Sequence, residues 1–378
     1  MSNVRVSVCL VAVIVMCGCA DAAFPDDELQ IAFVGQSLSR YDPRDFLEAP
    51  AGTVAPHLLA ADVAFTNLEV SIDGAYCPCP STKQGNSLQV ADPPVVEFLA
   101  GLNFGLLSLA NNHSWNYSGD GVRSTIQAAR DNRLTHAGTG ETLADAVGAG
   151  VRQVRGHKVG LIASATVKLG ADAMAGDARP GINLVRVGND GDWTRNLESI
   201  RAASDTTDIL IVYQHFQVED ADVAEGNPFG HEEVSDLAGW QRDWAHAVID
   251  AGASVYVAHG AREFRGVEVY RDRPIFYGLG NFIFHSGQPV GYYAHDVWES
   301  VIATVTFERG LPREVDFVPL VLDEGTPGPD FLQSRGVPEV AEGRLAEDII
   351  SRLVTLSAEW GTQLVVDQGR ARLTLNQD

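Results

Sequence analysis

The first two thirds of the chain alternate short apolar runs with segments of helical spacing. Apolar runs of this length predict buried β-strands, and amphipathic segments between them predict helices. The predicted strands are residues 29–35, 62–70, 104–110, 158–166, 208–215 and 253–259, and helical spacing is clearest at 93–102, 120–132 and 237–252. This order predicts a layered α/β domain.

The pattern changes after Gly266, where strand-like runs follow one another with only short turns between them. Residues 266–284, 299–310 and 312–322 predict antiparallel strands, which form either a second sheet or an extension of the first. Residues 339–361 have helical spacing, and 362–376 predict a short hairpin. We expect one main domain at 28–325, with the helix and hairpin of 326–378 packed on it.

Composition excludes one class of partner. The chain has 378 residues, 45% of them hydrophobic, which is enough to bury a sizeable core. Its formal net charge is -23. An acidic surface disfavours general binding of nucleic acid or of anionic membranes, so an anionic ligand needs a local basic pocket or a metal ion.

The first residues have the layout of an export signal. One arginine precedes an apolar stretch and then small residues, which predicts a removable signal at 1–23 and a mature protein in the periplasm or at the cell surface. Two processing routes stay open: lipid attachment at Cys19, with peripheral membrane association, or ordinary cleavage near Ala22 or Ala23. Cys77 and Cys79 are the cysteines outside this segment; a local disulfide is the ordinary interpretation, and a soft-metal site needs more ligands than two thiols supply.

Polar side chains follow the predicted strands. Carboxyl ends of parallel strands face the crevice where α/β proteins bind ligands, so these residues are functional candidates. Imidazole, carboxylate and carboxamide groups together suit manganese, iron or zinc better than calcium. The candidates are Gln36, Asn67, Glu69, Asn111, Asn112, His113, His215 and His259.

Longer motifs carry a resemblance to a known family. The segments "NLE", "ANNHSWNYSGDG", "VYQHFQVE", "GASVYVAHGAREFRG" and "YGLGNFIF" resemble the CapA-type poly-γ-glutamate capsule synthesis proteins. The resemblance extends from about Ile31 to Leu320. That family is similar to the calcineurin-like metallophosphoesterases, which implies a four-layer α/β sandwich, with two mixed β-sheets flanked by helices, and a metal site at the strand ends.

The resemblance also implies residue roles. Asn112, His215 and His259 match metal ligands, and Glu69 matches the region of a bridging carboxylate, although Asn67 competes for that place. His113 matches the histidine that protonates the leaving group or orients the substrate. Asn281, in the last motif, is expected to hold a loop near the site, and Gln36, Asn67 and Asn111 are expected to support the site or bind substrate.

Two positions depart from the family pattern. Gln36 stands where the family usually has aspartate, and Arg262 stands where it has a final metal-binding histidine. The resemblance implies that both positions serve the same metal, and arginine has no lone pair to give, so we expect one divalent ion or none. Arg262 then either grips a phosphate or carboxylate or is a plain surface arginine. Arg265, Arg271 and Arg273 either extend a basic rim or face water.

Two functions remain open from the sequence. The chain is either a metal-dependent hydrolase of the cell envelope, acting on a phosphoester or on an envelope polymer, or a non-catalytic accessory protein that binds a polyanionic polymer or export partners. Fold analogy alone does not decide between them. The sequence gives no oligomeric state.

Overall fold

The computed structural model describes residues 28–45, 53–74, 76, 88–217, 235–325, 328 and 331–375. The predicted export segment and the pair Cys77 and Cys79 lie outside the described residues. Among the helices that the structure does describe, none is long and apolar enough to span a membrane.

The first large sheet is mixed and is built around four parallel strands. Its order is β20-β21-β18-β17-β1-β3-β6-β7, with β19 also paired to β18. Strands β1, β3, β6 and β7 are parallel, whereas β17, β18 and β21 join in antiparallel pairs. The strands are β1 (Glu28–Phe33), β3 (Val63–Asn67), β6 (Phe104–Ser108), β7 (Thr135–Ala137), β17 (Glu299–Glu308), β18 (Leu311–Leu322), β19 (Pro338–Val340), β20 (Val365–Asp367) and β21 (Arg370–Thr374).

The second sheet is mixed in the same way. Its order is β14-β15-β13-β12-β10-β9, with β10, β12, β13 and β15 parallel and the two edge strands antiparallel. The strands are β9 (Gly150–Val154), β10 (His157–Val167), β12 (Ile209–Gln217), β13 (Val255–His259), β14 (Val267–Tyr270) and β15 (Arg273–Phe276). Short two-stranded pairs add β2 (Gln36–Leu38) with β16 (Asn281–Phe284), β4 (Ser71–Ile72) with β5 (Val90–Ala91), and β8 (Thr139–Gly140) with β11 (Gly181–Ile182).

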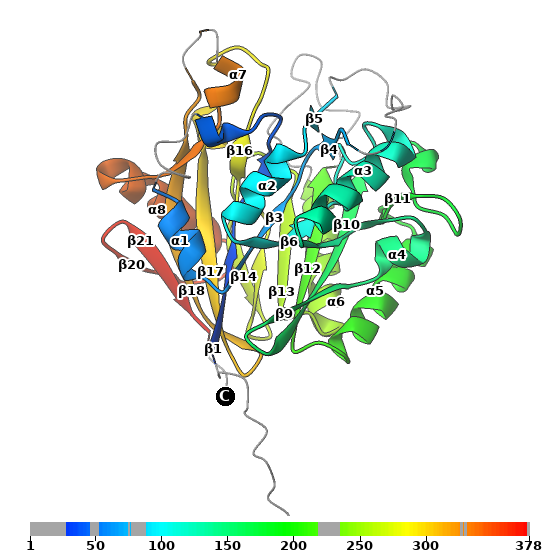
Figure 1. Cartoon of the computed structure of the whole chain (residues 1–378). Helices are drawn as coiled ribbons and strands as arrows, with labels where there is room; N and C mark the ends of the chain where they lie inside the picture. Colours follow the sequence, from blue (N-terminus) through cyan, green and yellow to red (C-terminus); the bar gives the residue numbers. More distant parts are fainter. Residues whose placement is uncertain are drawn as a thin grey trace, which may run out of the picture.

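The two sheets pack face to face between helices (Figure 1). Helices α1 and α2 cover the outer face of the first sheet, and α5 and α6 cover the outer face of the second. Aromatic rings join the inner faces, with Phe65 and Tyr213 centroids 5.5 Å apart and Phe33 and Phe276 centroids 5.9 Å apart. The helices are α1 (Ala55–Ala60), α2 (Pro94–Gly101), α3 (Ser118–Asp131), α4 (Leu143–Val147), α5 (Asp190–Ser204), α6 (Ser235–Asp250), α7 (Phe331–Ser334) and α8 (Gly343–Ala358).

Strand β12 shows why the second sheet is buried on both faces. Side chains alternate across a strand, so Ile211 and Tyr213 pack between the sheets while Leu210 and Val212 pack under α5 and α6. A strand with two apolar faces reads as a continuous apolar run in the sequence. That arrangement fixes the orientation of the residues that follow at the carboxyl end.

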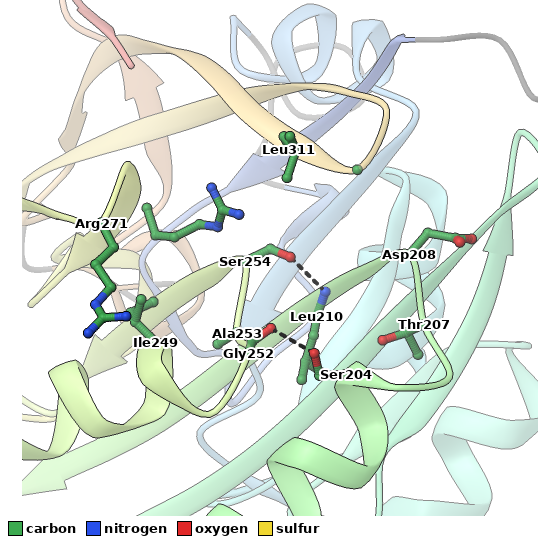
Figure 2. Close-up of a pocket in the computed structure, with 12 residues that line it drawn as sticks. Ser204, Thr207, Asp208, Leu210, Ile249, Gly252, Ala253, Ser254, Arg271 and Leu311 are labelled. Atoms are coloured by element: carbon green, nitrogen blue, oxygen red, sulfur yellow. Dashed lines mark hydrogen bonds between the residues drawn. The ribbon is translucent and has the colours of Figure 1, made fainter. Parts of the chain in front are cut away.

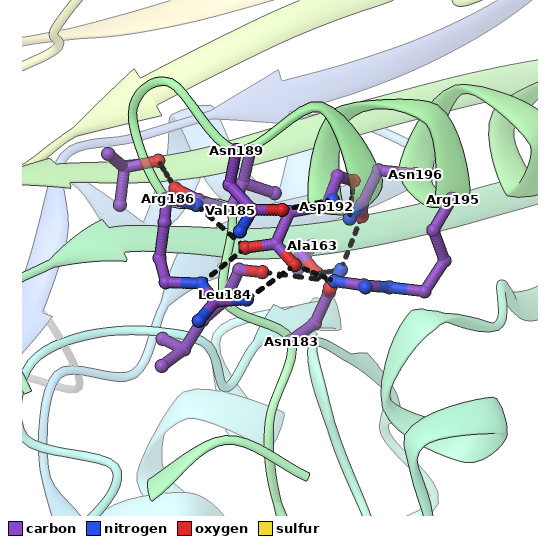
Figure 3. Close-up of polar contacts among 10 residues, drawn as sticks. Ala163, Asn183, Leu184, Val185, Arg186, Asn189, Asp192, Arg195 and Asn196 are labelled. Carbon is purple, nitrogen blue, oxygen red and sulfur yellow. Dashed lines mark hydrogen bonds and ion pairs between the residues drawn. The ribbon is translucent and has the colours of Figure 1, made fainter. Parts of the chain in front are cut away.

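A buried carboxylate joins the start of α5 to the segment that precedes it (Figure 3). Asp192 is 1% exposed and accepts hydrogen bonds from the side chains of Arg186 (2.6 and 3.0 Å) and Arg195 (3.0 Å). The Asn189 side chain caps the helix by accepting from the Asp192 amide. Burial alone would raise the pKa of Asp192, but the two arginines outweigh it and hold the pKa below its ordinary value.

The predicted pair of mixed sheets flanked by helices is confirmed. The later antiparallel strands, however, form neither a separate sheet nor a single extension: β14 and β15 join the second sheet, and β17 and β18 join the first. The C-terminal helix α8 contacts β14, β18 and β21, and the hairpin of β20 and β21 continues the first sheet.

Candidate functional site

Two histidines end neighbouring parallel strands of the second sheet. His215 on β12 is directly opposite His259 on β13 in the strand register. Alternation along β12 puts His215 on the same inner face as Ile211 and Tyr213, and alternation along β13 does the same for His259 with Val257. The two imidazoles therefore lie side by side between the sheets, at the carboxyl edge.

Glu69 reaches this position from the opposite sheet. It follows the end of β3 and is 4% exposed, and its Oε1 lies 3.8 Å from Nε2 of His215. The contact joins a carboxylate of the first sheet to an imidazole of the second. Residues 146 positions apart thus meet only because the sheets pack face to face.

His259 is the least satisfied polar side chain of this group. It is 2% exposed, and neither ring nitrogen has a hydrogen-bond partner among the described residues. Burial, together with the charge of His215, lowers the pKa of His259 to about 3, so its ring is neutral and keeps a lone pair. The turn after it requires glycine: Gly260 has φ of 125°, and a Cβ there would lie 2.0 Å from the Phe216 carbonyl oxygen.

Tyr213 contacts both histidines and was not among the predicted site residues. Its hydroxyl lies 3.3 Å from Nδ1 of His215, and its ring packs edge-on against His259 with centroids 5.4 Å apart. Burial, aided by the nearby charge of Glu69, raises the pKa of Tyr213 well above its ordinary value, so the phenol keeps its proton. Its spacing two residues before His215 on a predicted strand is the sequence signal that would have found it.

A second group of predicted residues ties the ends of β3 and β6 together. The Asn111 amide donates to Asn67 Oδ1 (3.1 Å) and to the Leu68 carbonyl (2.8 Å), and Asn111 Oδ1 accepts from the His113 backbone amide. Asn67 and Asn111 are fully buried. These two asparagines therefore hold the turn that presents Asn112 and His113.

Asn116 and Asn112 hold the ring of His113 between them. The Asn116 side-chain amide donates to the Gln89 carbonyl (3.0 Å), and the same NH₂ group lies 3.2 Å from Nδ1 of His113. Asn112 Nδ2 lies 3.5 Å from Nε2 of the same ring. Both ring nitrogens of His113 therefore face side-chain amides.

A third group occupies the position where the family pattern is broken. The Gln36 side-chain amide donates to Asn281 Oδ1 (3.1 Å), and Asn281 in turn donates to the carbonyls of Arg262 (2.9 Å) and Val297 (3.1 Å). The Arg262 guanidinium lies over the Tyr293 ring, 5.4 Å from its centroid. A network of neutral amides thus fills this position.

The suggestion that Arg271 and Arg273 extend a basic rim around the site is wrong. Arg271 and Arg273 belong to the turn between β14 and β15, and β15 runs parallel to β13. They therefore lie at the amino edge of the second sheet, whereas His215 and His259 lie at the carboxyl edge. These arginines cannot line the same site as Arg262.

The donor types of this group are those that transition metals prefer. The imidazoles of His215 and His259 and the carboxylate of Glu69 are neighbours. The buried ring nitrogens of His259 lack hydrogen-bond partners within the described part of the chain. Within the same described ranges, however, no three His, Cys, Asp or Glu side chains already stand at the spacing of a metal site. The side chains are therefore close to one another, but no three of them are arranged around a common point as the ligands of one ion are.

Sequence comparison identifies the family. The profile described as "Bacterial capsule synthesis protein PGA_cap" matches residues 30–286, more than half of the chain, and that region contains all the site residues above except Val297 and Tyr293. The chain belongs to the PGA_cap family. The expected kinship with capsule synthesis proteins is thereby confirmed.

PGA_cap relatives match the chain at modest identity. An uncharacterised protein of Sinorhizobium fredii, y4sH, is 26% identical over 82% of this chain and 85% of its own length. The PGA biosynthesis protein CapA of Bacillus subtilis is 27% identical over 81% of this chain and 75% of its own. A solved Staphylococcus aureus structure, provisionally named a 5′-nucleotidase, is 16% identical with a TM-score of 0.43, and the match covers 80% of this chain and 57% of that one.

Proposed function

We propose that this PGA_cap protein binds one divalent transition metal, manganese, iron or zinc, through His215, His259 and Glu69, with Asn112 as a further ligand. The observation that supports the proposal best is the pair of unpartnered nitrogens on buried His259. Each buried polar group without a partner costs about 1–3 kcal/mol. Neutral imidazole is the commonest protein ligand for metals, and a bound ion would satisfy one of these nitrogens.

Gln36 and Arg262, at the two positions that depart from the family pattern, support one ion rather than two. Gln36 offers a neutral amide that is already hydrogen-bonded to Asn281, and Arg262 offers a cation with no lone pair. Neither group replaces a carboxylate or an imidazole as a ligand. Arg262 instead supplies positive charge beside the ion, where it can bind a phosphate or carboxylate oxygen.

The residues around the ion can support hydrolysis. A bound ion of this type polarises a phosphoryl or acyl oxygen and lowers the pKa of bound water. In its protonated imidazolium form, His113, whose ring stands between Asn112 and Asn116, is the proton donor to the leaving group. Tyr213 holds the ring of His215 through Nδ1. The proposed substrate is a phosphoester or an anionic polymer of the cell envelope, after export directed by residues 1–23.

Metal content tests the proposal. Purified wild-type protein should carry about one equivalent of transition metal after reconstitution, as measured by inductively coupled plasma mass spectrometry, and His215→Ala and His259→Ala should carry none. His157→Ala is the matched control, because His157 is a buried histidine at the opposite end of β10 and its loss should leave the metal in place. A metal-free wild type after reconstitution would remove the basis for the hydrolase.

A non-catalytic role is the second candidate, and one observation favours it. No group of three potential ligands within the described ranges stands at metal spacing, so the crevice could serve as a recognition pocket. Such a protein would bind its anionic polymer equally well with and without chelator. A hydrolase would need the ion for turnover of a phosphoester substrate, and chelation would remove it.

A further inference from the structure

A second hollow lies at the other end of the molecule (Figure 2). It has a volume of about 300 Å³ and lies among the amino ends of β12, β13 and β15, the end of α5 and the turn between β17 and β18. Leu210 in its wall and His215 are five residues apart on β12, which is about 17 Å along an extended strand. The hollow is therefore distinct from the candidate metal site.

Arg273 is the unusual side chain in this wall. It is half-buried, and its hydrogen bond within the described chain is a long one, 3.4 Å to the carbonyl of Asp272. Burial lowers the pKa of Arg273, and the charge of Arg313 acts in the same direction, while Asp272 partly offsets both. No carboxylate among the described residues forms an ion pair with it. Half-buried cations are normally paired, so this guanidinium is available to an anion.

Two carboxylates near the hollow have partners of their own. Asp208 accepts a hydrogen bond from the Lys158 backbone amide (2.7 Å), and its carboxylate points away from Ser254 and Leu210 in Figure 2. Asp250 pairs with Arg271 at 2.9 Å. Asp272 is next to Arg273 in sequence, and its charge offsets only part of the effect of burial and of Arg313 on that guanidinium.

The rest of the wall completes a small binding site. The Ser254 hydroxyl accepts from the Leu210 amide (3.1 Å), which leaves its own hydrogen for another acceptor. Ile249 and Leu311 add short apolar surfaces. The volume is at the lower end of the range for small-molecule sites.

We propose that this hollow binds a small anionic molecule through a carboxylate or phosphate group. The Arg273 guanidinium donates hydrogen bonds to two oxygens of that group, and the Ser254 hydroxyl donates to another acceptor of the same molecule. The proposal does not depend on the metal site. Its ligand is small and carries a short apolar body, because the hollow is small and Ile249 and Leu311 belong to its lining.

Calorimetric titration tests the proposal with two probes, glutarate for the carboxylate and inorganic phosphate for the phosphate, and with glutaramide as the neutral control. Wild-type protein should bind at least one of the two anions saturably, one to one, and should not bind glutaramide. Binding of one anion only would identify the group. Arg273→Gln should weaken the binding by about tenfold or more, whereas Arg344→Gln, the same change at an exposed arginine of α8, should leave it unchanged.

A second variant tests the proposal independently, in case Arg273→Gln does not fold. Leu311→Glu places a carboxylate on the wall beside Arg273, where it should occupy the guanidinium and abolish binding of the added anion while the protein stays folded by circular dichroism. The proposal is overturned if wild type binds neither anion, or if Arg273→Gln or Leu311→Glu binds as wild type does.

Discussion

Replacing His259 by leucine should stabilise the metal-free protein. The side chain is 2% exposed, and its ring nitrogens, one donor and one acceptor, have no partner within the described chain. Removing two unpaired buried polar groups gains about 2–6 kcal/mol in principle, and the change of shape costs about 1–3 kcal/mol. We expect a net gain of about 1–3 kcal/mol. For a chain of this length that raises Tm by about 1–4 °C.

The same substitution should abolish stabilisation by metal. At a concentration of 100 times Kd, a ligand adds about 2.7 kcal/mol to the stability of the folded protein. Wild type should therefore melt higher after manganese or zinc is added, and His259→Leu should not respond. Differential scanning calorimetry of chelator-treated and metal-loaded samples measures both effects in one series.

His285→Leu is the control of opposite sign. His285 is also fully buried, but its Nδ1 accepts hydrogen bonds from the backbone amides of Arg40 (3.0 Å) and Tyr41 (3.3 Å). Leucine there leaves two donors unpaired and should lower Tm. If His259→Leu lowers the Tm of the metal-free protein as His285→Leu does, His259 is a structural residue and the reasoning fails.

Three further variants test separate parts of the account. Gln36→Asp combined with Arg262→His restores the ligand types that the family usually has at these positions. The double variant should raise the metal content from about one to about two equivalents, as measured by mass spectrometry. An unchanged metal content would mean that residues other than these two exclude the second ion. Tyr213→Phe removes the hydroxyl beside His215 Nδ1 and should weaken metal affinity by about 10–100-fold in chelator competition, with little change in Tm; equal affinity would show that the contact is incidental. Asp192→Ala should cost about 2–3 kcal/mol in urea unfolding, because the side chains of Arg186 and Arg195 and the Arg186 backbone amide lose the carboxylate to which they donate (Figure 3). The pKa of Asp192 is lowered in the folded state, so its carboxylate stabilises the fold fully above the unfolded-state pKa near 3.9, and this stabilisation is lost as pH falls through the folded-state pKa. Asp192→Asn should therefore reduce the loss of stability at acid pH. An unchanged dependence on acid pH would contradict this role of Asp192.

The strands could be predicted from the sequence, but not all of their partners. Continuous apolar runs such as 208–215 identify strands that are buried on both faces, and the helical patterns between them predict parallel order. The pairing of β1 with β17 joins residues about 270 positions apart, such as Ile31 and Val305. Periodicity carries no information on such pairing, so the later strands could not be assigned to a sheet.

The candidate site could be located from strand ends, but not its internal contacts. His215 and His259 end adjacent parallel strands, and that placement follows from the sequence pattern. The 3.8 Å approach of Glu69 to His215 depends on how the two sheets stack, which no local pattern encodes. The same holds for the hydrogen bond from Gln36 to Asn281, whose strands pair across 245 positions.

The most direct test of a single-ion site is an anomalous difference map from crystals of the metal-loaded protein, recorded at the absorption edge of the metal. We predict one peak, about 2.0–2.2 Å from a ring nitrogen of His215, a ring nitrogen of His259 and an oxygen of Glu69, with no peak beside Gln36 and Arg262. A peak beside Gln36 and Arg262, or a metal-loaded protein with no peak at the two histidines, would contradict the account.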